Sequence, residues 1–215
     1  LLYCYEDEIT DELIDTMRTE EKICNYIDIP LQHVSDRILS EMNRNSTSSS
    51  IRRTIDRLRE AIPDIHIRTT FITGFPGESE DDFEELCDFV QEVRFDRMGV
   101  FSYSQEENTP AANFDGQIDE ETKIDRRDRL MAIQQQISLE KNKAKIGSTT
   151  EVLCEGYDED SYMYFGRSYA DAPEVDGCVF FTCDGEKPKA GDFVKVRVTD
   201  YTGCDPVGEF VGKID

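Results

Sequence analysis

The chain has 215 residues, enough for one large domain or two ordinary ones. It carries 47 Asp and Glu against 24 Lys and Arg, and this net charge of −23 disfavours nucleic-acid phosphates and favours basic partners, although solubility alone would also explain it. No apolar run approaches the roughly 18 residues of a membrane span, and no basic and apolar leader opens the chain. Seven cysteines at irregular spacings therefore indicate a cytoplasmic protein without a membrane association.

Residues 1–147 show alternating strand and helix patterns. Apolar runs predict buried strands at residues 1–5, 26–32, 65–73 and 97–104. Helical spacing of apolar residues predicts helices over residues 9–17, 38–42, 51–62, 83–93 and 119–145. Ser48–Ser50 can cap the third helix, Ser79 and Asp82 form a capping box before the fourth, and Gly147 ends the last.

Strands separated by helices predict a parallel sheet with helices packed on it. The strand starts are roughly 25–40 residues apart, which is typical of the βα units of a TIM-like barrel. Four units are too few to close such a barrel, and the chain begins at Leu1 inside an apolar run. We therefore expect residues 1–147 to form a partial TIM-like barrel, the second half of a larger one. A complete small open sheet is the alternative.

After residue 147 the pattern changes to short strand-like runs divided by turns rich in Asp, Gly and Pro. The runs are TTEVLCEG, SYMYFGRSYA, GCVFFTC, DFVKVRVTDY and GEFVGKI. This density of short strands is typical of small OB-like barrels. The sequence therefore predicts a second domain over residues 148–215, folded as a five-stranded antiparallel β-barrel.

Ligands of parallel α/β folds bind at the carboxyl ends of the strands, so the loops ending at His33, Glu78 and Pro110 are expected to converge on one rim. Gly74 and Gly77 let the backbone approach a ligand near the amino end of the next helix, where Glu78 suits the helix dipole. The lysine of a phosphate-binding Walker loop is absent, which favours a zwitterionic or adenosyl ligand over a polyphosphate. A tight turn that binds nothing is the alternative.

Three polar residues are further candidates. Gln32 can both donate and accept, so it can orient a polar ligand. His33 follows it, and the alternative for this histidine is a hydrogen bond at the helix entry with Ser35 or Asp36. Arg68 lies within the third predicted strand; it is a buried cation that requires a carboxylate if it points into the barrel, and an ordinary surface charge if it points outward.

No metal site is predicted. Cys4, Cys24 and Cys87 are scattered and suit small apolar positions. The closest pair, Cys178 and Cys183, is separated by an odd number of positions along one strand run, which would place the two thiols on opposite faces. No nucleophile paired with a base identifies a catalytic residue either.

Three segments together, YIDIPLQHVSDRILSEMNR, RTTFITGFPGESEDDFEELCDFV and FSYSQEENTPAA, resemble the radical-SAM methylthiotransferases. The helix LMAIQQQISLEKNKAKIG and the barrel after it are similar to that family's linker helix and TRAM domain, so the resemblance covers nearly the whole chain. GRSYADAPEVDG resembles the RimO type, which modifies ribosomal protein S12, rather than the MiaB type, which modifies transfer RNA. Residues 148–215 carry 15 acidic against 6 basic residues, a net charge of −9, which also favours a basic protein over RNA.

The resemblance implies that S-adenosylmethionine is bound at the rim by Gln32, His33, Arg68, Gly74, Gly77, Glu78, Ser102 and Tyr103. It further implies that the intact enzyme uses two 4Fe–4S clusters to place a methylthio group on the β-carbon of an aspartate in ribosomal protein S12. The TRAM domain would dock this basic protein.

The chain departs from the family pattern in three respects. The C-x3-C-x2-C ligands of one cluster are absent, the three N-terminal cysteines of the other are absent, and Asn108 stands where glycine is expected. The resemblance therefore implies a C-terminal fragment that is monomeric and inactive alone. A module that binds protein or RNA without chemistry is the alternative.

Overall fold

The computed structural model describes residues 1–185 and 187–214. Contacts within the chain divide it into two compact units, Leu1–Ile137 and Ser138–Asp215. The division falls inside the long helix α5 (Glu120–Lys145). Among the described residues, no helix combines the length and the apolar character that crossing a membrane requires.

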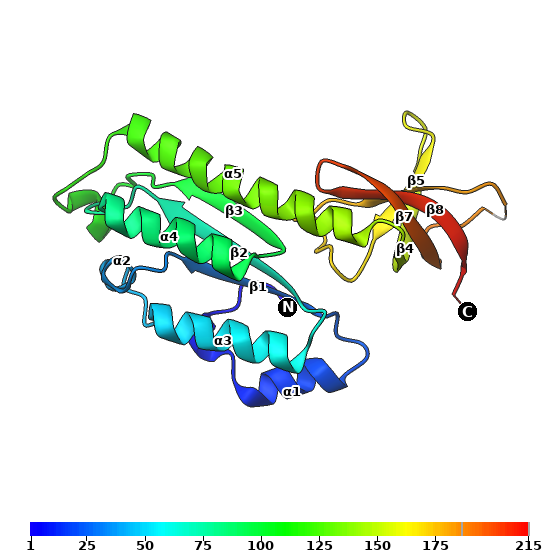
Figure 1. The fold of residues 1–215 in the computed structure, drawn as a ribbon, viewed down its shortest axis with the longest axis horizontal. Coiled ribbons are helices and arrows are strands. Elements are labelled where there is room, and N and C mark those ends of the chain that lie inside the picture. Colours follow the sequence, from blue (N-terminus) through cyan, green and yellow to red (C-terminus); the bar gives the residue numbers. More distant parts are fainter. Residues whose placement is uncertain (186, 215) are drawn as a thin grey trace. The chain divides into compact units, whose positions relative to one another are not determined.

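A parallel sheet forms the centre of the first unit (Figure 1). Its strands lie in the order β1 (Tyr26–Gln32), β2 (His66–Thr73) and β3 (Arg97–Ser102). The helical elements around it are η1 (Glu6–Glu8), α1 (Asp11–Thr19), α2 (Asp36–Glu41), α3 (Ser48–Ala61), α4 (Glu80–Val93), η2 (Pro110–Asn113) and α5. Strand, helix and strand follow one another along the chain, so this unit has the βα repeats of a partial TIM-like barrel, as predicted.

Helices cover one face of this sheet, and burial alternates along β2 accordingly. Ile67 and Phe71 are fully buried, whereas Arg68 and Ile72 on the opposite face are only partly buried. The ring of Phe71 packs edge-on against Phe89 of α4, with the ring centroids 6.3 Å apart. Burying such a side chain contributes about 1.5–3 kcal/mol. The covered face therefore stabilises the unit, and the opposite face remains partly open.

Capping residues decide where the two longest early helices begin. Thr47 caps α3, with its hydroxyl and that of Ser50 each accepting a backbone amide of the other. The predicted capping segment, Ser48–Ser50, thus begins one residue too late. The capping box of Ser79 and Asp82 before α4 is present as predicted.

The predicted buried strand at residues 1–5 is wrong. Leu1 and Tyr3 are 41% and 69% exposed, and the segment does not form a strand. Its backbone does contact β1, because the Asp28 amide donates to the Leu1 carbonyl and the Cys4 amide donates to the Asp28 carbonyl. Tyr3 lies between these two contacts with a left-handed φ of 57°, which inserts an extra residue and interrupts the ladder. The described sheet therefore contains one strand fewer than the sequence predicts.

The second unit contains a closed five-stranded barrel, as predicted. Its strands are β4 (Thr149–Asp158), β5 (Met163–Arg167), β6 (Val179–Thr182), β7 (Phe193–Thr202) and β8 (Asp205–Lys213). They close in the order β4-β5-β6-β8-β7, and the neighbours are antiparallel except for β6 and β8. β6 and β8 are parallel because the chain reverses its direction between β6 and β7 and again between β7 and β8. The buried core is Val152, Cys154, Tyr164, Val179, Phe181, Val194 and Val196.

Candidate functional site

The segments that follow β1, β2 and β3 converge at one edge of the sheet, as predicted. The Tyr103 amide, just after β3, donates to the carbonyl of Thr73 at the end of β2 over 2.8 Å. Phe75 in the next loop packs edge-on against Tyr103 and against Phe114, with ring centroids 5.3 and 6.2 Å away. These contacts tie the loop after β2 to the segment that runs from β3 through η2.

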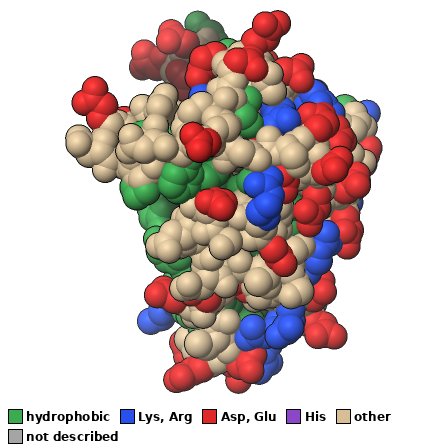
Figure 2. All heavy atoms as spheres, turned by 90° about the vertical axis from the view of Figure 1, so that its left-hand side faces the viewer, with side chains coloured by type: hydrophobic (Ala, Val, Ile, Leu, Met, Phe, Trp, Pro, Cys, Tyr) green, Lys and Arg blue, Asp and Glu red, His purple; other side chains and the backbone are tan. Residues whose placement is uncertain are grey.

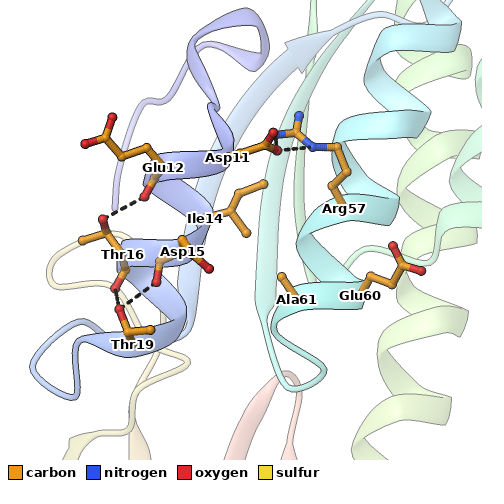
Figure 3. A pocket seen from close by; sticks show the side chains of 9 residues that line it. All are labelled: Asp11, Glu12, Ile14, Asp15, Thr16, Thr19, Arg57, Glu60 and Ala61. Atoms are coloured by element: carbon orange, nitrogen blue, oxygen red, sulfur yellow. Dashed lines mark hydrogen bonds and ion pairs between the residues drawn. The ribbon is translucent and has the colours of Figure 1, made fainter.

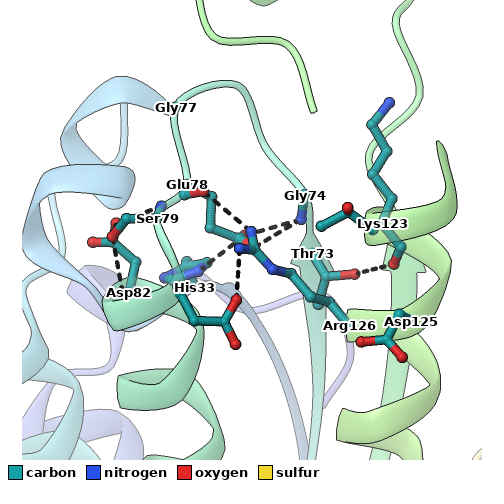
Figure 4. A network of polar contacts seen from close by, with 12 residues as sticks. His33, Thr73, Gly74, Gly77, Glu78, Ser79, Asp82, Lys123, Asp125 and Arg126 are labelled. Atoms are coloured by element: carbon teal, nitrogen blue, oxygen red, sulfur yellow. Dashed lines mark hydrogen bonds and ion pairs between the residues drawn. The ribbon is translucent and has the colours of Figure 1, made fainter. Parts of the chain in front are cut away.

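Glu78 lies inside this edge rather than on its surface (Figure 4). Its side chain has no exposed area, and both carboxylate oxygens lie 3.0 Å from the amide nitrogen of Gly74. Arg126 of α5 donates to Oε1 over 2.7 Å and to the backbone carbonyl of Glu78 over 3.1 Å. Nε2 of His33 lies 3.4 Å from Oε2. One buried carboxylate therefore connects the loops after β1 and β2 with α5.

His33 makes the helix-entry contact that the sequence left open. Its ring is completely buried, and Nδ1 accepts the backbone amide of Ser35 over 3.0 Å. A neutral ring in this environment carries its proton on Nε2, the nitrogen that faces Glu78. The imidazole is thus hydrogen-bonded through Nδ1, whereas the buried Nε2 faces the Glu78 carboxylate at 3.4 Å without a hydrogen-bond partner among the described residues.

Gly74 and Gly77 both adopt left-handed backbone conformations, with φ of 74° and 81°. Side chains rarely tolerate this region, so the turn requires glycine at these positions. The Gly74 amide donates to Glu78, and the Gly77 amide donates to the carbonyl of Gly116 over 2.9 Å. The amides of both glycines are therefore partnered within the chain and do not point into an empty anion site.

Gln32, Ser102 and Tyr103 occupy the rim itself. Gln32 ends β1 with a φ of 70°, at a shift in the register with β2, and its side-chain amide is partly exposed. The Ser102 hydroxyl donates to the carbonyl of Lys123 over 3.4 Å. The Tyr103 hydroxyl is buried without a hydrogen-bond partner among the described residues, and the Lys123 ammonium lies 5.3 Å from the centre of its ring.

Arg68 is not brought to this rim. It is the third residue of β2, five positions before Thr73, which corresponds to about 16 Å along a strand. Its guanidinium donates to the carboxylate of Asp28, fully buried on the neighbouring strand, over 3.2 Å. The carboxylate that a cation on this face requires is thus supplied by β1.

Sequence reasoning missed two basic residues of α5. The side chains of Lys123 and Arg126 are only 4% and 7% exposed. They belong to a helix whose many charges suggest a solvated surface, and no local pattern distinguishes them from their exposed neighbours. Only the packing of α5 against the loop after β2 makes them part of the site.

Asp82 does more than cap α4. Burial alone would raise its pKa, but hydrogen bonds from the Ser35 hydroxyl, from the hydroxyl and backbone amide of Ser79 and from Arg37 outweigh burial and hold the pKa well below its usual value. The ionised carboxylate therefore joins the residue before α2 to the start of α4, on either side of the rim.

Side chains that could bind a metal lie apart in the described part of the chain. Within residues 1–185 and 187–214, no three His, Cys, Asp or Glu side chains are placed to hold a metal ion. Burial raises the pKa of the Cys87 thiol to about 11, which disfavours the thiolate that binds metals.

The surface around the site is mainly acidic. Figure 2 faces the carboxyl ends of β1–β3 and shows Asp and Glu side chains spread over this face, with fewer Lys and Arg and a band of exposed hydrophobic atoms. A separate open depression of about 820 Å³ lies between α1 and α3 (Figure 3). It is lined by Asp11, Glu12, Ile14, Asp15, Thr16, Thr19, Arg57, Glu60 and Ala61, so it includes none of the predicted site residues.

Comparisons with known proteins agree with this architecture. Residues 3–90 match the radical SAM superfamily and residues 146–211 match the TRAM domain. The solved structure of coproporphyrinogen III oxidase HemN from Escherichia coli, a radical SAM enzyme, aligns with 63% of this chain and 32% of its own at a TM-score of 0.53. The two sequences are 21% identical, so this likeness concerns the fold alone.

Curated relatives are much more similar in sequence. The ribosomal protein uS12 methylthiotransferase RimO of Geobacter sulfurreducens is 47% identical over 98% of this chain, and that of Thermoanaerobacter sp. is 50% identical over 98%. The chain spans about half the length of these relatives, 47% of each. Because both domains match in order and the alignments with these relatives cover 98% of the chain at 47–50% identity, the chain belongs to the radical-SAM methylthiotransferase family, RimO type.

Proposed function

We propose that the chain carries the adenosyl-binding rim and the substrate-docking barrel of a methylthiotransferase that modifies the β-carbon of an aspartate in ribosomal protein uS12. The observation that carries the proposal is the convergence of three strand-end loops at one sheet edge. The chain in which they converge is 47–50% identical to proteins named for this activity. The alternative is a transfer-RNA methylthiotransferase, which the net charge of −9 over residues 148–215 disfavours.

S-adenosylmethionine fits the partly open face of the sheet beside the rim. Gly99 of β3 lies opposite Thr70, and a Cβ there would meet only the Phe101 ring and the Thr70 hydroxyl, each at 3.8 Å. A glycine inside a strand commonly marks a place where a ligand approaches the backbone. When bound, the ligand supplies the radical and methyl chemistry of the family. This chain's part is to bind it, orient it and exclude water.

The predicted residues then take different roles. Gln32, Ser102 and Tyr103 would touch the ligand at the rim, and Gly74 and Gly77 would shape the loop beside it. His33 and Glu78 would support that loop from inside, and Arg68 would lie deeper on the same face.

The iron–sulfur clusters do not fit this chain. The described residues assemble no group of ligands, and the buried Cys87 thiol resists ionisation. We therefore propose that the chain is inactive by itself. Reconstitution with iron and sulfide should leave its visible spectrum unchanged. A stable four-iron spectrum with cleavage of S-adenosylmethionine would contradict this.

Ligand binding can be tested without a cluster. S-adenosylhomocysteine should cause saturable amide shifts in Thr73–Gly77 and around Gly99 when titrated into the labelled chain. Gly99→Val should abolish these shifts by filling the open face, whereas Gly212→Val, at a strand position with no atom within 4 Å of a Cβ, should preserve them. Absence of shifts in the unsubstituted chain would sink the adenosyl-binding proposal.

The acidic barrel is proposed to dock the basic ribosomal protein. Its net charge of −9 over residues 148–215 supports a basic partner over RNA. Titration of the full chain with uS12 and with transfer RNA at several salt concentrations separates the two. Tight RNA binding with a steep salt dependence would reverse the choice. We further propose a cytoplasmic monomer, which sedimentation of the purified chain tests.

A further inference from the structure

We propose that Arg126 is a positioning residue that acts through Glu78 to hold the Gly74–Gly77 loop in its ligand-accepting shape. The ligand part of this inference rests on the proposed function. The loop-holding part rests only on the contacts of the chain. Arg126 lies 48 positions after Glu78 and on another element, so its role follows from the fold and not from a local motif.

The Glu78 carboxylate is not free to bind a ligand, because its side chain has no exposed surface. Both oxygens face the Gly74 amide, one also accepts from Arg126, and the other faces His33. A buried carboxylate is tolerated only when partners of this kind neutralise and hydrogen-bond it. Glu78 is therefore an internal part of the loop, and its partners determine whether the loop keeps its shape.

The Glu78 carboxylate lies at the turn between β2 and α4. Backbone amides at the turn between a strand and a helix commonly bind a phosphate. Here the chain's own carboxylate takes the place of such an anion at the Gly74 amide. The loop thereby accepts an adenosyl ligand without phosphate, and no external anion is needed to order it.

Arg126 is the residue that makes this arrangement possible. Its Nη1 donates to both the Glu78 carboxylate and the Glu78 carbonyl, and its Nη2 donates to Glu80 over 3.0 Å. Its guanidinium also lies 5.4 Å from the centre of the Phe83 ring. Four contacts from one buried side chain fix the start of α4 and the carboxylate together.

The same helix offers a matched control. Arg129 lies three positions further along α5 and also pairs with Glu80 and with Glu84. Its side chain is 43% exposed, and its partners among the described residues, Glu80, Glu84, Asp125 and the Phe83 ring, lie outside the Gly74–Gly77 loop. Arg126→Met and Arg129→Met thus remove equivalent groups, and only the first reaches Glu78. Arg126→Lys keeps the charge with a single donor group.

The experiment uses the full chain and two readouts. Hydrogen exchange of the Gly74 amide, followed by NMR, should accelerate at least tenfold in Arg126→Met, less in Arg126→Lys, and not in Arg129→Met. Affinity for S-adenosylhomocysteine should fall at least tenfold in the same order. Should Arg126→Met not fold, Glu78→Gln replaces it, because it removes the charge that Arg126 neutralises, and at least threefold faster exchange at Gly74 is expected.

Equal exchange at Gly74 in the Arg126→Met and Arg129→Met chains, or unchanged exchange in Glu78→Gln, would overturn the inference. A loss of ligand affinity without faster exchange would also overturn it, because the loop would then not be the means. If the unsubstituted chain binds no S-adenosylhomocysteine but Gly74 responds as expected, the proposed function fails while Arg126 remains the residue that holds the loop.

Discussion

A Cβ atom on Gly74 would overlap Cγ of Lys123 and lie 3.3 Å from its Cα, because α5 passes directly against the loop after β2. The φ of Gly74 is also left-handed, at 74°. These two constraints are independent, since one concerns the backbone of the loop and the other the packing of a distant helix. Together they make this glycine a sensitive probe of how the loop is built.

Gly74→Ala should lower the free energy of unfolding by about 2–4 kcal/mol, because both a strained φ and an overlap must be relieved. Urea denaturation of the full chain measures it. Gly99→Ala is the control, since its Cβ would make only contacts of 3.8 Å, and its stability should stay within about 0.5 kcal/mol. Equal stability of the two variants would show that α5 does not pack on the loop in this way.

Asp82→Asn should destabilise the chain by about 1.5–3 kcal/mol at pH 7, because it weakens hydrogen bonds to a charged group. The folded pKa of Asp82 lies below its ordinary value of 3.8, so the stability that its charge contributes is present above that value and is lost as the pH falls below it. The difference in the free energy of unfolding between the variant and the unsubstituted chain should therefore shrink as the pH falls from 5 to 2. Urea denaturation at several pH values in this range measures it. Asp81→Asn, at an exposed neighbouring position, should show no such convergence.

Cysteine labelling should follow burial. Cys24 and Cys204 are exposed and should react with iodoacetamide at pH 8 in the folded chain. Cys87 should not react, because burial raises its pKa to about 11 and only about one thiol in a thousand is then ionised. Mass spectrometry of peptides from native and urea-unfolded samples measures this. Rapid native labelling of Cys87 would mean that α4 does not cover it.

Gly208→Ala should destabilise the barrel by at least about 2 kcal/mol, because overpacking against rigid atoms forces the backbone to move. Its Cβ would overlap the Arg197 carbonyl oxygen and lie 3.0 Å from the carbonyl carbon, where β8 pairs with β7. Gly212→Ala on the same strand meets no atom within 4 Å and should be nearly neutral. Thermal unfolding followed by circular dichroism compares the two. Similar melting of both variants would argue against this close approach of strands.

The failed expectation at residues 1–5 illustrates a limit of apolar patterns. LLYCY has the composition of a buried strand, and its backbone does approach β1. Whether such a run continues a ladder of hydrogen bonds depends on the backbone conformation of single residues. Tyr3 adopts a left-handed conformation that the surrounding sequence does not predict. The parallel pairing of β6 with β8 likewise could not be predicted from either strand, because closure of the barrel decides which strand edges pair.

The sequence by itself determined the order of the two folds and, apart from the strand expected at residues 1–5, their helices and strands, because apolar periodicity, capping residues and turn residues act over a few neighbouring positions. It also determined that the loops after the strands meet, since parallel strands end at one edge. Only the tertiary structure decided that Glu78 turns inward, that Arg126 and Lys123 belong to the site, and that Arg68 lies away from the rim and pairs with Asp28. These outcomes depend on buried charges and on contacts between residues that are far apart in the sequence. Such contacts form only when the elements pack together and exclude water, and no local pattern predicts them.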